Sequence, residues 1–173
     1  MISVIAGKYK GRKLHDVNNL HVRPTQAKVR KSIFQILEPL NDMEVLDLYA
    51  GVGTLGIESL SRGATRVVFV EKNRKVIKVL KKNLEFFDTE NCNVILADAL
   101  QFAARLKRTS FDIIFADPPY AEIQYNKIKE KVERILKPGG VFCMEMKKEQ
   151  INIPDVRVEN YGSTQVVFWR ATA

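Results

Sequence analysis

The fold of this chain is decided by the stretch Asp47-Leu48-Tyr49-Ala50-Gly51-Val52-Gly53-Thr54-Leu55-Gly56. The apolar run 45–49 predicts a short strand, and the three glycines form a G-x-G-x-x-G turn into a helix that reaches about residue 62. Glycine has no Cβ atom, so the backbone can turn sharply there and approach a bound ligand closely. Nicotinamide and flavin enzymes share this spacing, so the turn by itself indicates a nucleotide-binding α/β protein without identifying the ligand.

Short apolar runs and helical periodicities alternate after this turn. We expect strands at residues 66–71, 93–97, 111–116 and 141–146, and helices at about 74–87, after Asp98, and at about 125–136. A final antiparallel pair is expected at 156–161 and 165–170. Repeated strand–helix units imply a parallel sheet with helices on both faces. In such sheets a ligand binds beyond the carboxyl ends of the strands, near the point where the strand order reverses.

The first 31 residues carry most of the net charge of the chain. They hold eight basic residues and one acid, so seven of the eight net positive charges lie in this segment. A basic segment on a nearly neutral domain is typical of an arm that binds phosphate groups. A solvated basic surface without a specific partner explains the charge equally well when charge alone is considered.

Local signals predict the structure of that segment. Glycines at 7 and 11 favour a tight hairpin between short strands at 3–6 and 12–14. Pro24 keeps the residue before it extended, and Thr25 is expected to cap a helix over about 26–38. The apolar residues of this helix share one face, whereas Lys28, Arg30 and Lys31 are expected to face away from the core.

Composition excludes several classes of protein. A chain of 173 residues suits one domain, and no apolar run approaches the roughly 20 residues that span a bilayer. The amino terminus has no secretory leader, and the only cysteines, Cys92 and Cys143, are far apart, so we expect a cytoplasmic protein without disulfides. Two distant cysteines with His15 and His21 do not form a metal-ligand set, so no metal is expected.

Of three acids on the expected strands, Asp47 and Asp98 favour S-adenosylmethionine as the ligand, whereas Glu71 suits either class of nucleotide cofactor. Glu71 lies 20 residues after Gly51, where a carboxylate can accept both hydroxyls of a ribose, although a solvated acid is the alternative. Asp47 lies inside a strand, where a dinucleotide fold has an apolar residue, and its carboxylate suits the cationic amino group of a methionine moiety. Asp98 can accept a hydrogen bond from the adenine amine or merely cap its helix.

The motif Asp117-Pro118-Pro119-Tyr120 at the end of the fourth expected strand indicates the reaction. The lone pair of a base amine is delocalised into the ring, so the amine is a poor nucleophile. A carboxylate and a carbonyl that accept its two N–H bonds would hold it and favour the pyramidal nitrogen of the transition state. Consecutive prolines orient the Pro118 carbonyl, and Tyr120 offers a face on which an extruded base can stack. A plain Pro-Pro turn is the alternative, but it would leave the ordered set of acids and glycines unexplained.

Together these residues resemble the RsmD-type family of ribosomal RNA methyltransferases, which modify the exocyclic N2 amine of a guanine in small-subunit (16S) RNA. The resemblance extends over nearly the whole chain, and its most discriminating part is the I-x-G-x-Y-K-G-R-K-L stretch at residues 5–14, followed by Arg23-Pro24-Thr25. It implies a Rossmann-like α/β methyltransferase fold. This fold has a seven-stranded, mostly parallel sheet with an antiparallel C-terminal strand, preceded by a small N-terminal β-hairpin.

The resemblance also implies roles for individual residues. It makes residues 1–25 an RNA-binding extension and 26–173 the methyltransferase domain. The amine site would be formed by Asp117, Pro118, Pro119 and Tyr120, and S-adenosylmethionine would be held by Asp47, Tyr49, Gly51, Gly53, Glu71, Asp98 and Ala99. RNA would be bound by Lys8, Lys10, Arg12, Lys13, Arg23 and Thr25.

The partner implied is ribosomal RNA or a small-subunit assembly intermediate. We expect the protein to act as a monomer and to bind neither a membrane nor a metal. Two other functions stay open. Asp-Pro-Pro-Tyr chemistry also suits an adenine N6 amine in DNA or RNA, although 173 residues leave little room for the recognition domain of a DNA enzyme. A non-catalytic RNA-binding scaffold is the other alternative, and we would expect the motifs of such a protein to be eroded.

Overall fold

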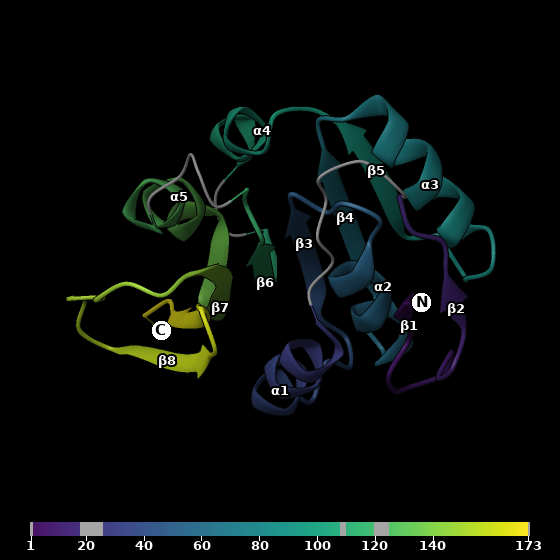
Figure 1. Ribbon diagram of the computed structural model, residues 1–173. Helices are drawn as coiled ribbons and strands as arrows, with labels where there is room; N and C mark the ends of the chain where they lie inside the picture. Colours follow the sequence, from purple (N-terminus) through teal and green to yellow (C-terminus); the bar gives the residue numbers. More distant parts are fainter. Residues whose placement is uncertain (1, 18–25, 108–109, 120–124, 173) are drawn as a thin grey trace.

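A computed structural model describes residues 2–17, 26–107, 110–119 and 125–172 (Figure 1). Seven of the described strands form one sheet, in the order β5-β4-β3-β6-β7-β9-β8. Their bounds are β3 Glu44–Leu48, β4 Arg66–Glu71, β5 Cys92–Leu96, β6 Phe111–Ala116, β7 Leu136–Lys147, β8 Val156–Tyr161 and β9 Thr164–Arg170. The helices are α1 Ala27–Leu37, α2 Thr54–Ser61, α3 Arg74–Leu84, α4 Ala99–Arg105 and α5 Tyr125–Val132, the last continuing as a 3-10 turn at Glu133–Ile135.

Strand direction confirms the predicted fold class. Strands β3 to β7 pair in parallel, and β9 alone runs against both of its neighbours, β7 and β8. The chain moves outward from β3 to β5 on one side and then returns to place β6 on the other side of β3. The strand order therefore reverses at β3, which makes the carboxyl ends of β3, β4 and β6 the expected ligand site.

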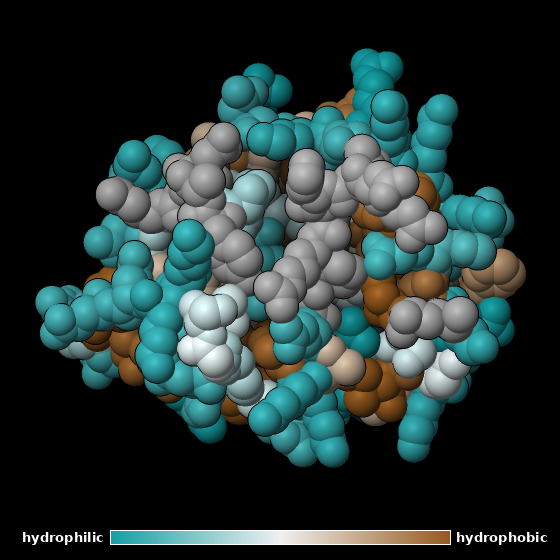
Figure 2. All heavy atoms as spheres, viewed as in Figure 1, coloured by the Kyte–Doolittle hydropathy of each residue, from teal (hydrophilic) through white to brown (hydrophobic). Residues whose placement is uncertain are grey.

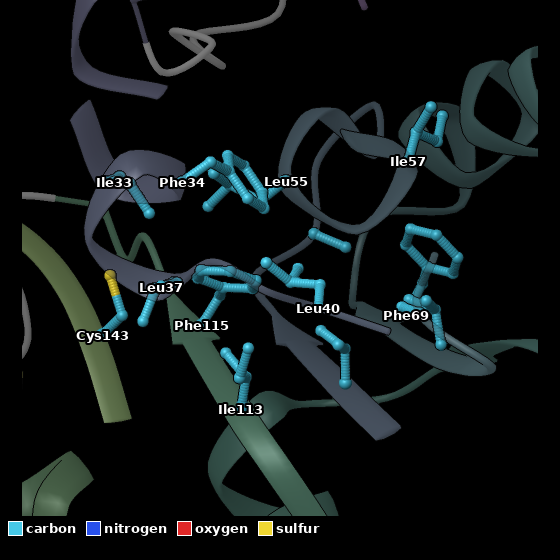
Figure 3. Close-up of a cluster of buried hydrophobic side chains, with 14 of the residues drawn as sticks. Ile33, Phe34, Leu37, Leu40, Leu55, Ile57, Phe69, Ile113, Phe115 and Cys143 are labelled. Carbon is cyan, nitrogen blue, oxygen red and sulfur yellow. The ribbon is translucent and has the colours of Figure 1, made fainter. Parts of the chain in front are cut away.

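Alternating side chains of the strands form two apolar layers. On one face, residues such as Phe69, Ile113 and Phe115 pack against α1, α2 and α3 (Figure 3). On the other face, residues such as Leu46 and Ile114 pack against α4 and α5. The sheet therefore lies between two helical layers, as the repeated strand–helix pattern predicted (Figure 1).

The amino-terminal segment forms a shorter hairpin than predicted. Its strands are β1 Ile2–Ser3 and β2 Lys13–Leu14, and hydrogen bonds between Val4 and residues 11 and 12 extend the pairing. The backbone N–H groups of Ile5 and Ala6 donate to the buried carboxylate of Glu58 in α2, at 2.8 and 3.0 Å. A Cβ atom on Gly7 would lie 1.8 Å from the carbonyl oxygen of Ser61, so only glycine allows this close approach.

One prediction for the first helix is wrong. Arg30 was expected to face away from the core, but it is only 3% exposed and donates to the carbonyl oxygen of Ser3 at 2.8 Å. Helical periodicity identifies the side that faces the sheet, but it does not reveal that the hairpin covers a second side. The predicted Thr25 cap lies outside the described residues, and the N-cap position of α1 is Gln26, which makes no side-chain capping bond.

The last parallel strand begins earlier than predicted. The Lys137-Pro138-Gly139-Gly140 segment was expected to separate a helix from a strand at 141–146, but β7 already starts at Leu136. Gly139 N–H donates to Ala171 O, and Ala171 N–H donates to Gly140 O, so this segment is held by the end of the chain. A register shift between Phe111 and Ile113 accommodates the extra residues.

Candidate active site at the carboxyl edge of the sheet

The register of three neighbouring strands brings the predicted site residues together. Leu48 at the end of β3 pairs with Val70 of β4 and with Ala116 of β6. Glu71 and Asp117 each follow one of these partners, and the glycine turn begins directly after Leu48. Adjacent strands lie about 4.8 Å apart, so the glycine turn, Glu71 and Asp117 lie close together at one edge of the sheet. Glu71 is the residue predicted to bind the ribose, and Asp117 is the residue predicted to bind the amine.

The glycine turn has a backbone conformation that side chains disfavour. Gly51 and Gly53 have φ values of 56° and 91°, and a Cβ atom on Gly53 would lie 2.4 Å from Cδ1 of Leu80. Tyr49 also has a positive φ, 59°, which is uncommon for a residue with a side chain. The turn therefore leaves open backbone at the sheet edge, and strain at a non-glycine residue is typical of functional sites.

Glu71 closes the turn on one side. Its carboxylate accepts hydrogen bonds from the N–H of Gly51 at 3.1 Å and from the N–H of Asn73 at 2.8 Å. These two bonds orient the side chain, and the remaining lone pairs of the carboxylate can accept hydroxyl groups of a ligand. The solvated acid that the sequence left as an alternative does not describe Glu71, because the residue is half-buried and bonded to the turn.

Asp47 is a buried acid beneath the same turn. It is 2% exposed, and its Oδ2 accepts a hydrogen bond from the N–H of Gly56 at 2.9 Å. Burial raises the pKa of Asp47 to about 7, the bond from Gly56 opposes that rise, and the negative charge of Glu71 adds to it. A buried carboxyl with a pKa near neutrality would be stabilised in its charged form by a nearby cation.

Asp98 and Tyr49 lie near each other on the β5 side of the turn. Asp98 caps α4, since its Oδ1 accepts from the N–H of Gln101 at 3.0 Å, so the capping role that the sequence left open is real. Burial raises the pKa of the Tyr49 hydroxyl, and the charge of Asp98 raises it further. The Tyr49 hydroxyl is buried and has no hydrogen-bond partner in the described part of the chain. Ala99 is buried next to Asp98.

The amine candidate follows β6 directly. Asp117 is half-buried, Pro118 is buried and Pro119 is exposed, while Tyr120 lies outside the described residues. Burial raises the pKa of the Cys143 thiol, and the charges of Glu145 and then Asp117 raise it further. Phe115 pairs with Cys143, so Asp117 and Glu145, each two residues further along its strand, are at positions on the same side of the sheet as Cys143.

Two features of this edge were missed in the sequence. Glu145 is 7% exposed within β7, and an acid in an otherwise apolar strand was the signal that had singled out Asp47. A cavity of about 410 Å³ lies between the start of α5 and the segment after β7, lined by Tyr125, Asn126 and residues 149–153. Tyr125 is 2% exposed, and its hydroxyl has no hydrogen-bond partner in the described part of the chain. Only the tertiary structure brings these segments together.

The predicted RNA-binding residues of the hairpin do not join this edge. Lys8 N–H donates to the carbonyl of Ser61 at the end of α2, and the Tyr9 hydroxyl accepts from the N–H of Asp88 before β5. The hairpin tip with Lys8 and Lys10 therefore lies at the amino ends of β4 and β5, opposite the glycine turn. Arg12 and Lys13 are exposed on the returning strand, and Arg23 and Thr25 lie outside the described residues.

Comparison with known proteins identifies the family. A family model described as "Conserved hypothetical protein 95" matches residues 2–170. "Ribosomal RNA small subunit methyltransferase D" of Haemophilus influenzae is 34% identical over 169 residues, which cover 92% of this chain and 84% of that protein. The chain belongs to this RsmD family. The membership confirms the resemblance that the motifs predicted.

Two other similar proteins match along nearly their whole length. "Putative rRNA methyltransferase YlbH" of Bacillus subtilis is 36% identical over 180 residues, covering 96% of this chain and 97% of that protein. The solved structure "Putative methyltransferase yhhF" of Escherichia coli superposes with a TM-score of 0.88 at 31% identity, covering 99% of this chain and 98% of that one. The fold of this chain, hairpin included, is thus shared with that structure over nearly its whole length.

The described residues contain neither a helix that could span a membrane nor a cluster of potential metal ligands. Among them, no helix is long and apolar enough to cross a membrane. Their His, Cys, Asp and Glu side chains also form no group of three or more that could hold a metal ion.

Proposed function

We propose that this protein transfers a methyl group from S-adenosylmethionine to the exocyclic N2 amine of a guanine in small-subunit ribosomal RNA. One observation carries the proposal: Asp117-Pro118-Pro119 and the glycine turn both begin where Leu48 and Ala116 pair. A methyl donor over the turn and an amine at Asp117 would therefore lie within reach of each other. The names of the relatives support ribosomal RNA as the substrate.

The residues of the turn fit the donor. The Glu71 carboxylate suits the ribose hydroxyls of the donor. Hydrogen bonds from Gly51 and Asn73 hold this carboxylate at the turn. The cationic amino group of the donor suits Asp47, and the buried Tyr49 hydroxyl offers an unused donor and acceptor near Asp98. S-adenosylmethionine supplies a methyl group that its sulfonium has already activated, so the protein's task is chiefly to place the acceptor in line.

The residues at the end of β6 would prepare the acceptor. The Asp117 carboxylate and the Pro118 carbonyl would each accept one N–H of the amine, which keeps the nitrogen lone pair directed at the donor. Proline lacks an N–H, so no backbone donor at position 118 competes for the Asp117 carboxylate. The stacking role of Tyr120 stays a prediction. Guanine is our choice of base, and adenine N6 is the alternative that the same groups would accept.

We expect the affinity for S-adenosylmethionine to rise about tenfold between about pH 6 and pH 8. Asp47 has its pKa raised to about 7, so it is mostly neutral at the lower pH and charged at the higher one. The cationic amino group binds the charged form, so binding below pH 7 must first release a proton. Isothermal titration calorimetry across this range measures the dependence. The Asp47→Asn variant should bind weakly at every pH, and an unchanged pH profile in that variant would refute the role of Asp47.

The base is identified by mapping methylated nucleotides in ribosomal RNA. Cells that lack this protein should lose one N2-methylguanine from small-subunit RNA, and the wild-type gene should restore it. Loss of a methyladenine instead would support the adenine alternative, and an unchanged methylation map would support the scaffold.

Both cysteines, Cys92 and Cys143, are free, which suits the reducing cytoplasm in which we place the protein.

A further inference from the structure

The outer side of α3 is a basic surface that the proposed reaction does not use. Helix α3 holds five basic residues and no acid, and Lys72 precedes it. At 100° per residue, these five residues fall within an arc of about 120°, opposite the buried residues of the helix. The exposed residues are Arg74, Lys75, Lys78, Lys81 and Lys82, and the buried ones are Val76, Ile77, Leu80, Asn83 and Leu84.

The cations of α3 have no acidic partner among the described residues, unlike some basic residues elsewhere in the fold. On the opposite side of the sheet, Lys129 pairs with Glu133, and at the amino ends of the strands Lys137 pairs with Glu44 and Asp112. Within the described residues, the five cations of α3 enter no ion pair. Glu85, the nearest acid along the helix, lies beyond its last residue. Like charges on this face repel one another, and an anionic partner would relieve that repulsion.

The basic side of α3 continues into the hairpin. The buried side chain of Asn83 bonds to both the N–H and the carbonyl of His15, at 2.7 and 3.0 Å, so the chain after β2 is fastened along α3. The Arg12 guanidinium lies 5.2 Å from the ring centre of Phe86, which is 47% exposed just after α3. Figure 2 shows hydrophilic side chains standing out from the part of the surface where Figure 1 places α3.

We propose that the outer face of α3, with Arg12, Lys13 and Phe86, binds the phosphate backbone of the substrate RNA. This basic face starts at Arg74, three residues after Glu71, and ends at the hairpin. Glu71 and Asp117 lie at the same edge of the sheet, two strand spacings apart, or about 10 Å. RNA on this face would thus connect the hairpin to the active site. Phe86 with its neighbouring guanidinium gives an unpaired base a flat surface to stack on.

RNA fits this face better than an anionic membrane does. A helix that lies on a bilayer inserts its apolar side between the lipids. The apolar side of α3 is already buried against the sheet, where Val76 and Leu80 are fully covered. Phosphate groups, in contrast, need only exposed cations, and each one neutralised releases bound counterions.

The test removes three charges from the basic face. Lys75→Gln, Lys78→Gln and Lys82→Gln are combined, and the control combines Lys107→Gln, Lys127→Gln and Lys131→Gln, three exposed lysines in the layer on the other face of the sheet. Binding to small-subunit ribosomal RNA transcribed in vitro is measured at several salt concentrations. We expect the α3 variant to bind on the order of tenfold more weakly than the control. The slope of log affinity against log salt should fall by about 2, since each lost phosphate contact removes about 0.7 from it.

A second variant tests the stacking surface. Phe86→Ala should weaken binding to single-stranded RNA at least about fivefold, and Phe86→Tyr should restore it, because tyrosine keeps the flat ring. Phe86 is half-exposed, so neither change removes a core residue. Equal binding by the alanine and tyrosine variants would overturn the stacking role.

The inference rests on the proposed function for its choice of RNA, and the two can fail separately. Methyl transfer to the same RNA is measured with the wild-type protein. If wild type transfers methyl groups but the two lysine variants bind RNA equally, the basic face is not the RNA surface. If RNA binding depends on α3 but no methyl transfer occurs, the RNA-binding surface is supported and the proposed reaction is refuted. Binding to vesicles that contain anionic phospholipid, lost in the α3 variant while RNA binding is kept, would overturn the proposal in favour of a membrane.

Discussion

Replacing Asp117 by alanine should lower methyl transfer to RNA about a hundredfold to a thousandfold, the usual loss when one group aimed at a transition state is removed. In the proposed reaction, the carboxylate would hold the amine and stabilise the positive charge that develops on its nitrogen. The glycine turn, Glu71 and Asp47 remain intact, so affinity for S-adenosylmethionine should change little. Single-turnover transfer and calorimetric binding of the donor measure the two effects separately.

A control from the same strand sharpens this test. Asp112 is also in β6, but it lies at the amino end, where it accepts from the N–H of Glu44 and pairs with Lys137. Asp112→Ala removes a carboxylate from β6 without touching the site edge, so transfer should be nearly unchanged. Asp117→Asn keeps one acceptor oxygen and should lie between alanine and wild type. Full methyl transfer by the Asp117→Ala variant would show that the amine is not held by Asp117 at this edge of the sheet.

Replacing Glu58 by alanine should lower the free energy of unfolding by about 3–5 kcal/mol, the cost of breaking a buried charge pair. Glu58 is 1% exposed and accepts from Ile5 N–H, Ala6 N–H and Arg62 Nε at 2.8, 3.0 and 2.8 Å. Its loss leaves two backbone donors and one guanidinium without this acceptor, and it removes two of the hydrogen bonds that hold the hairpin to α2. For a chain of this length, the melting temperature should fall on the order of 10 °C.

Glu38 provides the matched control for this prediction. Its carboxylate pairs with the same Arg62, but its side chain is 48% exposed. Solvent screens such a pair, so Glu38→Ala should cost less than about 1 kcal/mol. Urea or thermal unfolding of the two variants gives the comparison directly. If they were equally stable, the Glu58 carboxylate would not be what fastens the hairpin.

Local patterns in the sequence predicted most of the elements because each pattern has its cause within a few residues. Apolar alternation, glycines that allow positive φ and prolines that end helices all act over short distances. The order of the motifs then predicted which strand ends carry chemistry, since parallel strands present their carboxyl ends at one edge. Asp47, Glu71 and Asp117 were found in this way.

Long-range packing decided what these patterns could not. Arg30 is buried by a hairpin that lies 27 residues earlier in the chain, and β7 begins early because the end of the chain pairs with Gly139 and Gly140. Glu145 joins the site edge only through the pairing of β7 with β6. None of these contacts leaves a periodic signal near the residue concerned.

The sequence alone determined the α/β fold, the glycine turn and the carboxylates at the strand ends. Only the tertiary structure decided that the hairpin tip lies at the far edge of the sheet and that its returning strand joins the lysines of α3 in one surface. Strand and helix formation follow from local backbone and side-chain preferences. Which surfaces become neighbours depends on register and docking, and these are set by contacts between residues far apart in the chain.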